Sequence, residues 1–433
     1  MNSLLNPKSI AVIGASRFKK KVGYIVYNNL INSKLKVYPV NPKARSIKGN
    51  KVYSNINEVK ESIDCAVVCI PAQLVPSVIK DCAVKGVGSV IIISAGFKEA
   101  GNAKLEEEVI KQAGKMRVLG PNVLGIIKPG YFNASFFEGM PRKGGISFIS
   151  QSGALGVALL DSAIKEGLGL RYFISIGNMA DVDFDDLINE LNNDPETSVI
   201  VLYAESLKDG PSFMKACWES KKPIIVLKAG KSVEGRRATS SHTGSLAGSS
   251  EVYEAAFKQA GVRSASTLTS LINSALLADK FSLTGKRVLI ITNAGGPSIL
   301  MTDACVGNKL EVPKLPDSVK DKLSKALPPV WSHNNPIDVV GDALADRYKN
   351  VFDVISKESF YDTIIVMLTP QAMTEVKETA QAVINLHKIT GKPVIPCFLG
   401  GAKIEEGLKL FKKEGMPVFI DINELADALS IIS

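Results

Sequence analysis

The 433-residue chain is predicted to fold as an α/β protein, with three doubly wound parallel-sheet domains in series. Short apolar runs rich in Val and Ile alternate with helical patterns from one end to the other, which is typical of parallel strands buried on both faces. The length corresponds to about three domains of roughly 150 residues each. With 45% hydrophobic and 22% charged residues, the composition excludes a disordered chain and a small disulfide scaffold.

Each domain is predicted from apolar runs that end in turns of small or polar residues. Those of the first domain, residues 1–127, are SIAVIGAS (9–16), LKVYPVNP (35–42), CAVVCIPA (65–72), SVIIISAG (89–96) and MRVLGPN (116–122). Those of the second, residues 128–284, are GGISFISQSG (144–153), RYFISIGN (171–178), TSVIVLYAE (197–205) and KPIIVLKAG (222–230). Those of the third, residues 285–433, are RVLIITNAGG (287–296), YDTIIVMLTP (361–370), KPVIPCFLGG (392–401) and MPVFIDI (416–422). Ligands of such sheets bind beyond the carboxyl ends of the strands, so functional residues are expected at the strand exits.

Charge and cysteine content limit the ligand class and the compartment. The 52 basic and 43 acidic residues give a net charge of +9, but no aromatic interleaving or basic tail accompanies it, so small phosphorylated ligands are favoured over nucleic acid. Six cysteines without a CxxC pair and only three histidines indicate reduced thiols and no metal site. No signal-peptide pattern and no apolar run of about 18 residues is found, so we expect a cytoplasmic protein without a membrane segment.

The turn after the first strand, Gly14-Ala15-Ser16, indicates a nucleotide-like ligand. Glycine there lets the backbone approach a pyrophosphate, and a helix starting at the turn offers free N–H groups. The second strand ends in Asn41-Pro42-Lys43, which lacks the acid that holds the ribose in NAD binders but has a cation that suits a phosphorylated ribose. NADP and coenzyme A both fit. Ile70, Pro71, Ser94 and Gly96 would complete the rim, although such residues also populate turns without any ligand.

The segment SSHTGSLAG (240–248) is predicted to be a loop able to move, because nine residues with one leucine cannot anchor a core. Arg236 and Arg237 precede it and would stabilise phosphate charge. This pattern favours His242 as a phosphoryl carrier, whereas His333 and His387 are interpreted as structural. A nucleophilic imidazole needs an acceptor for the proton on its second nitrogen. Glu205, at the exit of an apolar strand, is the candidate.

A second anion site is predicted at Ser152, Gly153 and Ala154, where a strand leads through a turn into an apolar helical pattern. The first N–H groups of that helix, with its dipole, would hold a phosphate such as that on a phosphorylated His242. An ordinary turn between strand and helix is the alternative.

Taken together, these motifs resemble the α subunit of ADP-forming acyl-CoA synthetases, in the superfamily of succinyl-CoA synthetase. Besides the segments above, the resemblance rests on Gly120-Pro121-Asn122, SQSGALG (150–156), Ile176-Gly177-Asn178, Asn293-Ala294-Gly295-Gly296-Pro297 and Asn335-Pro336-Ile337-Asp338. It implies a Rossmann-like CoA-binding domain followed by two flavodoxin-like domains. It also implies the reversible conversion of acyl-CoA, ADP and phosphate into a carboxylic acid, ATP and CoA.

The resemblance further implies roles for individual residues. His242 would take the phosphoryl group from an acyl phosphate, Glu205 would orient the imidazole, and the turn at 152–154 would cradle the phosphate. The CoA-binding residues would be Gly14, Ala15, Ser16, Asn41, Pro42, Lys43, Ile70, Pro71, Ser94, Gly96 and Asn122. The sequence shows no glycine-rich lid and no paired Mg²⁺-binding acids, so ADP or ATP with Mg²⁺ is expected on a separate ATP-grasp β subunit, in an α₂β₂ assembly. A swing of His242 would connect the two phosphate sites.

Two other functions remain open from the sequence. One is a non-catalytic CoA-binding or sensing protein of the same fold, in which His242 would have no task. The other is an NADP oxidoreductase, for which no set of residues for hydride transfer is found. The acyl group is open as well, because acetate, a branched or aryl acid and a hydroxyacid are all compatible with these motifs.

Overall fold

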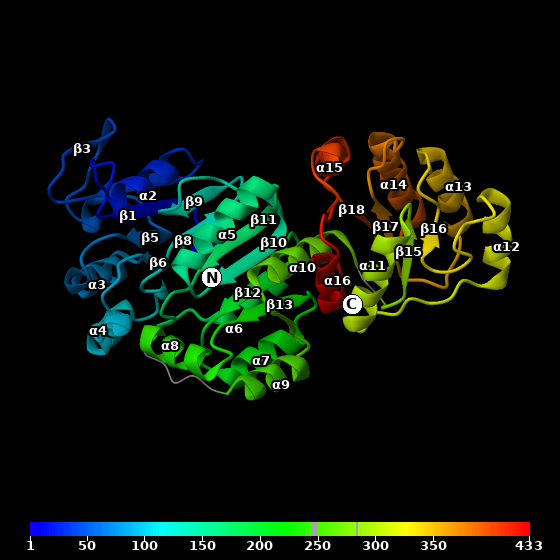
Figure 1. Cartoon of the computed structure of the whole chain (residues 1–433). Coiled ribbons are helices and arrows are strands. Elements are labelled where there is room, and N and C mark those ends of the chain that lie inside the picture. Colours follow the sequence, from blue (N-terminus) through cyan, green and yellow to red (C-terminus); the bar gives the residue numbers. More distant parts are fainter. Residues whose placement is uncertain (244–248, 283–284) are drawn as a thin grey trace. The chain divides into compact units, whose positions relative to one another are not determined.

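A computed structural model describes residues 1–243, 249–282 and 285–433 (Figure 1), with the side chains of 240–243 excepted. The chain forms two compact units, Met1–Ser264 and Ala265–Ser433. Each is an α/β body built around mostly parallel strands, so the predicted fold class is confirmed. Within the described ranges, no helix combines the length and the apolar character needed to cross a membrane.

The first sheet has five parallel strands in the order β2-β1-β5-β6-β7. Their bounds are β1 (Ser9–Ile13), β2 (Lys36–Val40), β5 (Cys65–Val68), β6 (Ser89–Ile92) and β7 (Arg117–Leu119). Helices α2 (Val22–Ile31), α3 (Val75–Lys85) and α4 (Ala103–Ala113) connect them, with the short turns η1 (Ile56–Glu58), η2 (Ala72–Leu74) and η3 (Lys98–Ala100) and a small hairpin of β3 (Ser46–Ile47) and β4 (Asn50–Lys51). Since the chain moves from β1 to β2 on one side and later to β5 on the other, the topological switch point lies between β1 and β5.

The second sheet has the order β14-β13-β12-β10-β11-β8-β9. Its parallel strands are β10 (Arg142–Ser150), β11 (Gly169–Ser175), β12 (Val199–Ala204) and β13 (Ile224–Lys228). β8 (Gly125–Lys128) and β9 (Phe132–Ser135) form a hairpin that pairs antiparallel with β11, and β14 (Arg263–Ala265) forms the other edge. The helices are α5 (Gly153–Glu166), α6 (Phe184–Asn192), α7 (Gly210–Glu219), α8 (Val233–Thr243) and α9 (Ser250–Gln259). β10 is the switch strand, because β11 and β12 flank it on opposite sides.

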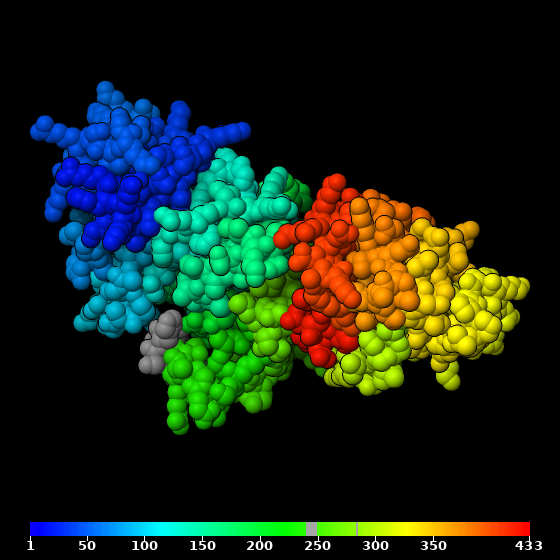
Figure 2. All heavy atoms as spheres, turned by 45° about the horizontal axis from the view of Figure 1, so that its top comes forward, coloured from blue at the N-terminus to red at the C-terminus, as the bar shows by residue number. Residues whose placement is uncertain are grey.

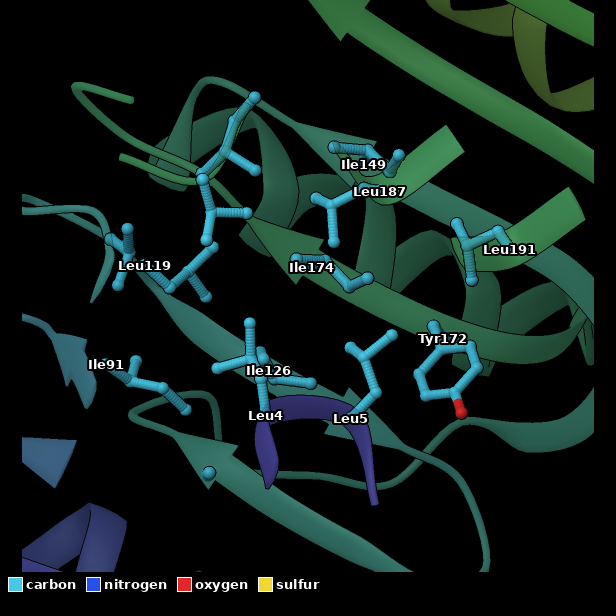
Figure 3. Close-up of a cluster of buried hydrophobic side chains, with 14 of the residues drawn as sticks. Leu4, Leu5, Ile91, Leu119, Ile126, Ile149, Tyr172, Ile174, Leu187 and Leu191 are labelled. Atoms are coloured by element: carbon cyan, nitrogen blue, oxygen red, sulfur yellow. The ribbon is translucent and has the colours of Figure 1, made fainter. Parts of the chain in front are cut away.

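The first two sheets share one hydrophobic core. The short helix α1 (Asn2–Leu5) inserts Leu4 and Leu5 between them (Figure 3). On one side lie Ile91 and Leu119 of the first sheet, and on the other lie side chains of the second sheet such as Ile126. In the space-filling view, the blue and cyan atoms of the first sheet meet the teal atoms of the second without a break (Figure 2). The first unit is therefore held together by continuous apolar packing.

The second unit contains a four-stranded parallel sheet in the order β16-β15-β17-β18. The strands are β15 (Val288–Thr292), β16 (Ile337–Asp338), β17 (Thr363–Leu368) and β18 (Val394–Phe398). The helices are α10 (Leu268–Lys280), α11 (Gly295–Gly307), α12 (Asp317–Ala326), α13 (Ala345–Ile355), α14 (Val376–Thr390), α15 (Glu405–Lys413) and α16 (Ile422–Ile432), with η4 (Ala402–Ile404) before α15. The strand expected at 416–422 forms only an isolated bridge, between Cys397 and Phe419.

Candidate active site

The switch point of the first sheet is built around two glycines. Gly14 directly follows β1 with φ +90°, and a Cβ atom there would lie 2.4 Å from the carbonyl oxygen of Cys69. Gly23 lies in the first turn of α2, and its Cβ would lie 1.9 Å from the carbonyl oxygen of Gly14. Only glycine fits at either position, so bare backbone lines the turn after β1. The helix itself begins later than the sequence suggested, at Val22, after the basic residues that follow Ser16.

Polar side chains tie neighbouring turns of this edge together. The Asn41 side chain after β2 donates to the carbonyl oxygen of Ala15 at 2.7 Å and accepts from the N–H of Lys43 at 2.8 Å. Asn41 therefore fixes the turn that carries Lys43 against the turn after β1. A residue that the sequence assigned to the ligand thus has a clear structural task as well.

Ser94 has the same function between β5 and β6. Its hydroxyl donates to the carbonyl oxygen of Ile70 at 2.5 Å and accepts from the N–H of the same residue at 3.2 Å. The N–H of Asn122 donates to the Ser94 carbonyl oxygen at 3.0 Å. The turns after all five strands therefore meet at one edge, which carries the whole predicted cofactor set: Gly14, Ala15, Ser16, Asn41, Pro42, Lys43, Ile70, Pro71, Ser94, Gly96 and Asn122.

The second sheet presents a helix start at its own carboxyl edge. Ser152 caps α5, and its hydroxyl accepts from the N–H of Leu155 at 3.3 Å. Gly153 and Ala154 form the first turn, where the N–H groups have no acceptor within the helix. Ser152 and Gly153 are half-buried and Ala154 is exposed. The turn is therefore accessible to an anion.

Gln151 lies in the SQSGALG motif but was given no role of its own from the sequence; in the structure, its side chain connects two turns of this edge. It is only 8% exposed, and its side-chain oxygen accepts from the N–H groups of Glu205 at 2.7 Å and Ser206 at 3.0 Å. Its side-chain nitrogen donates to the Ser206 hydroxyl at 3.0 Å. Gln151 thus holds the backbone of Glu205 against the turn that leads into α5. A buried amide directly before a Ser-Gly helix start is the signal that could have revealed it.

Glu205 follows β12 and is 9% exposed; besides Gln151, its described polar neighbours include Tyr203 and Lys228. Tyr203 forms a side-chain hydrogen bond with Glu205, and burial together with the nearby carboxylate charge raises the pKa of Tyr203 to about 12. The Lys228 ammonium group donates to the Glu205 carbonyl oxygen at 2.8 Å. Burial lowers the pKa of Lys228, although the charge of Glu205 acts in the opposite direction. The carboxyl group therefore lies in a largely desolvated, polar environment beside the helix start.

His242 lies in the last turn of α8. Residues 240–243 are thus helical where a loop was expected, because the preceding Arg and Ala residues favour a helix that continues into the segment. α8 packs on the turn after β13, where a Cβ at Gly230 would lie 2.6 Å from the Thr239 hydroxyl. The side chain of His242 and residues 244–248 lie outside the described residues. The pairing of His242 with Glu205 therefore stays a prediction.

The motifs of the second unit lie at the edge of its own sheet. The Asn293 side chain forms two hydrogen bonds with the backbone of Thr369, both 2.9 Å long. Asp338 accepts from the N–H of Val340 at 2.9 Å. These contacts explain the two motif residues structurally. In the described part of the chain, no three His, Cys, Asp or Glu side chains gather in a way that could hold a metal ion.

Three family models match the chain in sequence order. They are a CoA binding domain over residues 8–129, a succinyl-CoA ligase like flavodoxin domain over 143–278 and a ligase-CoA domain over 288–429. The chain is 39% identical to the α subunit of ADP-forming acetate–CoA ligase II from Pyrococcus furiosus, and the match covers 99% of this chain and 96% of that subunit. This chain belongs to the family of ADP-forming acetate–CoA ligase α subunits.

Two further comparisons agree with membership in this ligase family. The chain is 39% identical to ADP-forming acetate–CoA ligase I from Archaeoglobus fulgidus, over 100% of this chain but only 63% of that longer protein. A solved structure of the dinucleotide-forming acetyl-coenzyme A synthetase 1 from Ca. Korarchaeum cryptofilum, in complex with phosphate and ADP, superposes with a TM-score of 0.95. That match has 36% identity and covers 100% of this chain and 96% of the other. The ligase family is thus confirmed by sequence and by fold.

Proposed function

We propose that the chain is the catalytic α chain of an NDP-forming acyl-CoA synthetase. It would interconvert acyl-CoA, ADP and phosphate with a carboxylic acid, ATP and CoA. The observation that carries the proposal is that one compact unit contains both a switch-point turn that only glycine can form and a Ser152-capped helix start, which Gln151 connects to the backbone of the buried Glu205. A reaction that joins a thioester to a phosphate needs these two kinds of site in one body.

Coenzyme A would bind at the carboxyl edge of the first sheet. The turn at Gly14 has no side chain, so its backbone is open to the close approach of a pyrophosphate. Lys43 is exposed beyond Asn41 and supplies a cation for the ribose phosphate. Ser94 and Asn122 continue the rim toward the second sheet, where the thiol end of CoA would have to lie.

Phosphate would bind at the N-terminus of α5 and attack the carbonyl carbon of the thioester. The C–S bond then breaks, CoA leaves as its thiol after taking up a proton, and an acyl phosphate remains. A ring nitrogen of His242 next attacks the phosphorus, the bond between phosphorus and the acyl oxygen breaks, and the carboxylic acid leaves. The Glu205 carboxylate would accept a hydrogen bond from the N–H of the other ring nitrogen, and its negative charge would stabilise the charged phosphohistidine.

ADP would receive the phosphoryl group on a partner subunit. The proposal therefore includes an ATP-grasp β subunit that holds ADP or ATP with Mg²⁺, most simply in an α₂β₂ assembly. The α-subunit relative and the longer single-chain relative described above support this division of the reaction. We also infer a cytoplasmic location, which the six free cysteines, five of them buried, support.

The test is phosphorylation of the chain by labelled ATP in the presence of the co-expressed β subunit. The expected product is an acid-labile, base-stable phosphoprotein that disappears in His242→Ala and forms at least tenfold more slowly in Glu205→Gln. His333→Asn is the matched control, because asparagine tolerates the positive φ of 51° found there. If the unmodified chain binds CoA but is never phosphorylated, the non-catalytic CoA-binding protein is the correct assignment.

A further inference from the structure

The edges of the first and second sheets are joined by an asparagine that the proposed reaction has not used. Asn178 follows β11, and its backbone N–H donates to the Pro121 carbonyl oxygen at 3.0 Å. The N–H of Ala180 donates to the Gly120 carbonyl oxygen, also at 3.0 Å. A Cβ at Gly177 would lie 2.2 Å from the Pro121 oxygen. The turn after β11 therefore lies directly on the turn that carries Asn122.

The side chain of Asn178 extends this link to a pair of carboxylates. Its amide nitrogen donates to Glu99 at 2.5 Å and to Glu106 at 2.7 Å. Burial raises the pKa of Glu106. Burial also disfavours the charged form of Glu99, but the hydrogen bonds from Asn178 and from the backbone outweigh it, so the pKa of Glu99 is lowered. The contact between Asn178 and Glu99 is therefore a charge-assisted hydrogen bond in a half-buried setting.

Glu99 also bonds to the turn after β6, which belongs to the proposed CoA site. Its other oxygen accepts from the N–H groups of Gly96 at 2.6 Å and Phe97 at 3.2 Å. Gly96 has φ +110°, a conformation that only glycine adopts readily, so this turn depends on outside contacts to keep its shape. A continuous chain of hydrogen bonds thus runs from the end of β11, through Asn178 and Glu99, to the turn after β6.

This chain of contacts also lies beside the helix that carries His242. α8 contacts η3, the short turn that contains Glu99 and precedes α4. Three functional parts are therefore close to η3: the turn after β6, the edge of the second sheet and the helix of the proposed phosphohistidine.

We infer that Asn178 and Glu99 are positioning residues that hold the thioester end of the CoA crevice in register with the phosphate at the start of α5. This inference rests on the proposed function. The thioester carbon and the attacking phosphate oxygen must be held at reacting distance, although they are bound by two different sheets. A misplacement of about 1 Å can lower the rate roughly 10²-fold. Phosphorylation of His242 by ATP does not involve the thioester, so it should not depend on this contact.

The experiment measures two half-reactions in Asn178→Ala, Glu99→Gln and the double variant, each in complex with the β subunit. Glu99→Gln keeps an acceptor for Gly96 but turns an amide nitrogen toward the nitrogen of Asn178. We expect kcat for acyl-CoA formation at saturating CoA to fall at least tenfold in each single variant, with no further loss in the double variant. Phosphorylation of His242 by ATP should stay within twofold of the unmodified protein.

The control is Asn193→Ala, which removes an exposed asparagine side chain at the C-terminal end of α6 that donates to the Asn189 carbonyl oxygen at 2.9 Å. It should leave both half-reactions unchanged. The positioning role is overturned if both half-reactions fall together with the melting temperature, or if Glu99→Gln, which preserves side-chain volume, leaves kcat unchanged. Failure of the proposed function itself would look different, because the unmodified chain would then show neither half-reaction.

Discussion

Replacing Gln151 with alanine tests whether the Gln151 side chain positions Glu205, the proposed partner of His242. The substitution removes the acceptor for two backbone N–H groups, those of Glu205 and Ser206, and the donor to the Ser206 hydroxyl. All of these groups are buried. The backbone that carries Glu205 would lose its only described side-chain link to the turn before α5.

The contacts set the size of the effect. A buried N–H group left without an acceptor costs about 1–3 kcal/mol, so two cost about 2–6 kcal/mol. Water can enter the space of a side chain that is 8% exposed, so we expect the lower part of this range, about 2–4 kcal/mol. At about 2–4 °C per kcal/mol for a body of this size, the melting temperature of the first unit should fall by roughly 4–16 °C. Phosphorylation of His242 should slow at least tenfold, because Glu205 is no longer held.

Calorimetry and the rate of phosphohistidine formation are the two assays. Gln371→Ala is the matched control, since that glutamine is exposed and reaches the Asn293 carbonyl oxygen only at 3.5 Å. It should change neither quantity. If Gln151→Ala has the same melting temperature as the unmodified protein and is phosphorylated at the same rate, the reasoning that Gln151 positions Glu205 is wrong.

Three other predictions follow from contacts and pKa shifts described by the structure. Gly23→Ala should destabilise the first unit by more than about 3 kcal/mol and abolish CoA binding, because the added Cβ meets a carbonyl oxygen at 1.9 Å; normal CoA binding measured by calorimetry would contradict this. Burial raises the pKa of Asp183, the cap of α6, to about 6 from 3.8, so its contribution to stability is present below pH 4 and lost as the pH rises through 6. Asp183→Asn, which keeps the cap, should therefore raise the free energy of unfolding at pH 8 by about 1–3 kcal/mol in urea titrations and change it little at pH 4. Burial raises the pKa of all six cysteine thiols to about 12, so iodoacetamide at pH 8 should label none of them before the protein unfolds, as mass spectrometry would show.

Strands with continuous apolar patterns could be predicted from the sequence, while elements defined by packing could not. β1, β5 and β15 are buried along their whole length and lie inside the predicted runs. The hairpin of β8 and β9 has no such pattern and is stabilised by its pairing with β11. As a result, the boundary predicted near residue 127 falls inside β8. The structure divides the chain into two compact units, and the predicted division into three domains stays a prediction.

The candidate site shows the same division between local pattern and long-range contact. The turn glycines and Ser152 could be predicted because their local geometry demands particular residue types. Gln151 and Asn178 could not, because their roles depend on partners 54 and 79 residues away along the chain. The loop expected at 240–248 was inferred from composition alone, which says nothing of the helix that extends into it from residue 233.

The insertion of Leu4 and Leu5 of α1 between the first two sheets has a consequence for engineering. A chimera that exchanges CoA recognition between relatives cannot take residues 1–127 as a module, because that cut splits the hairpin and leaves Leu4 and Leu5 facing a foreign surface. Donor segments should instead be joined in the exposed residues between β9 and β10, so that the graft brings along both the leucines and the antiparallel strands on which they rest.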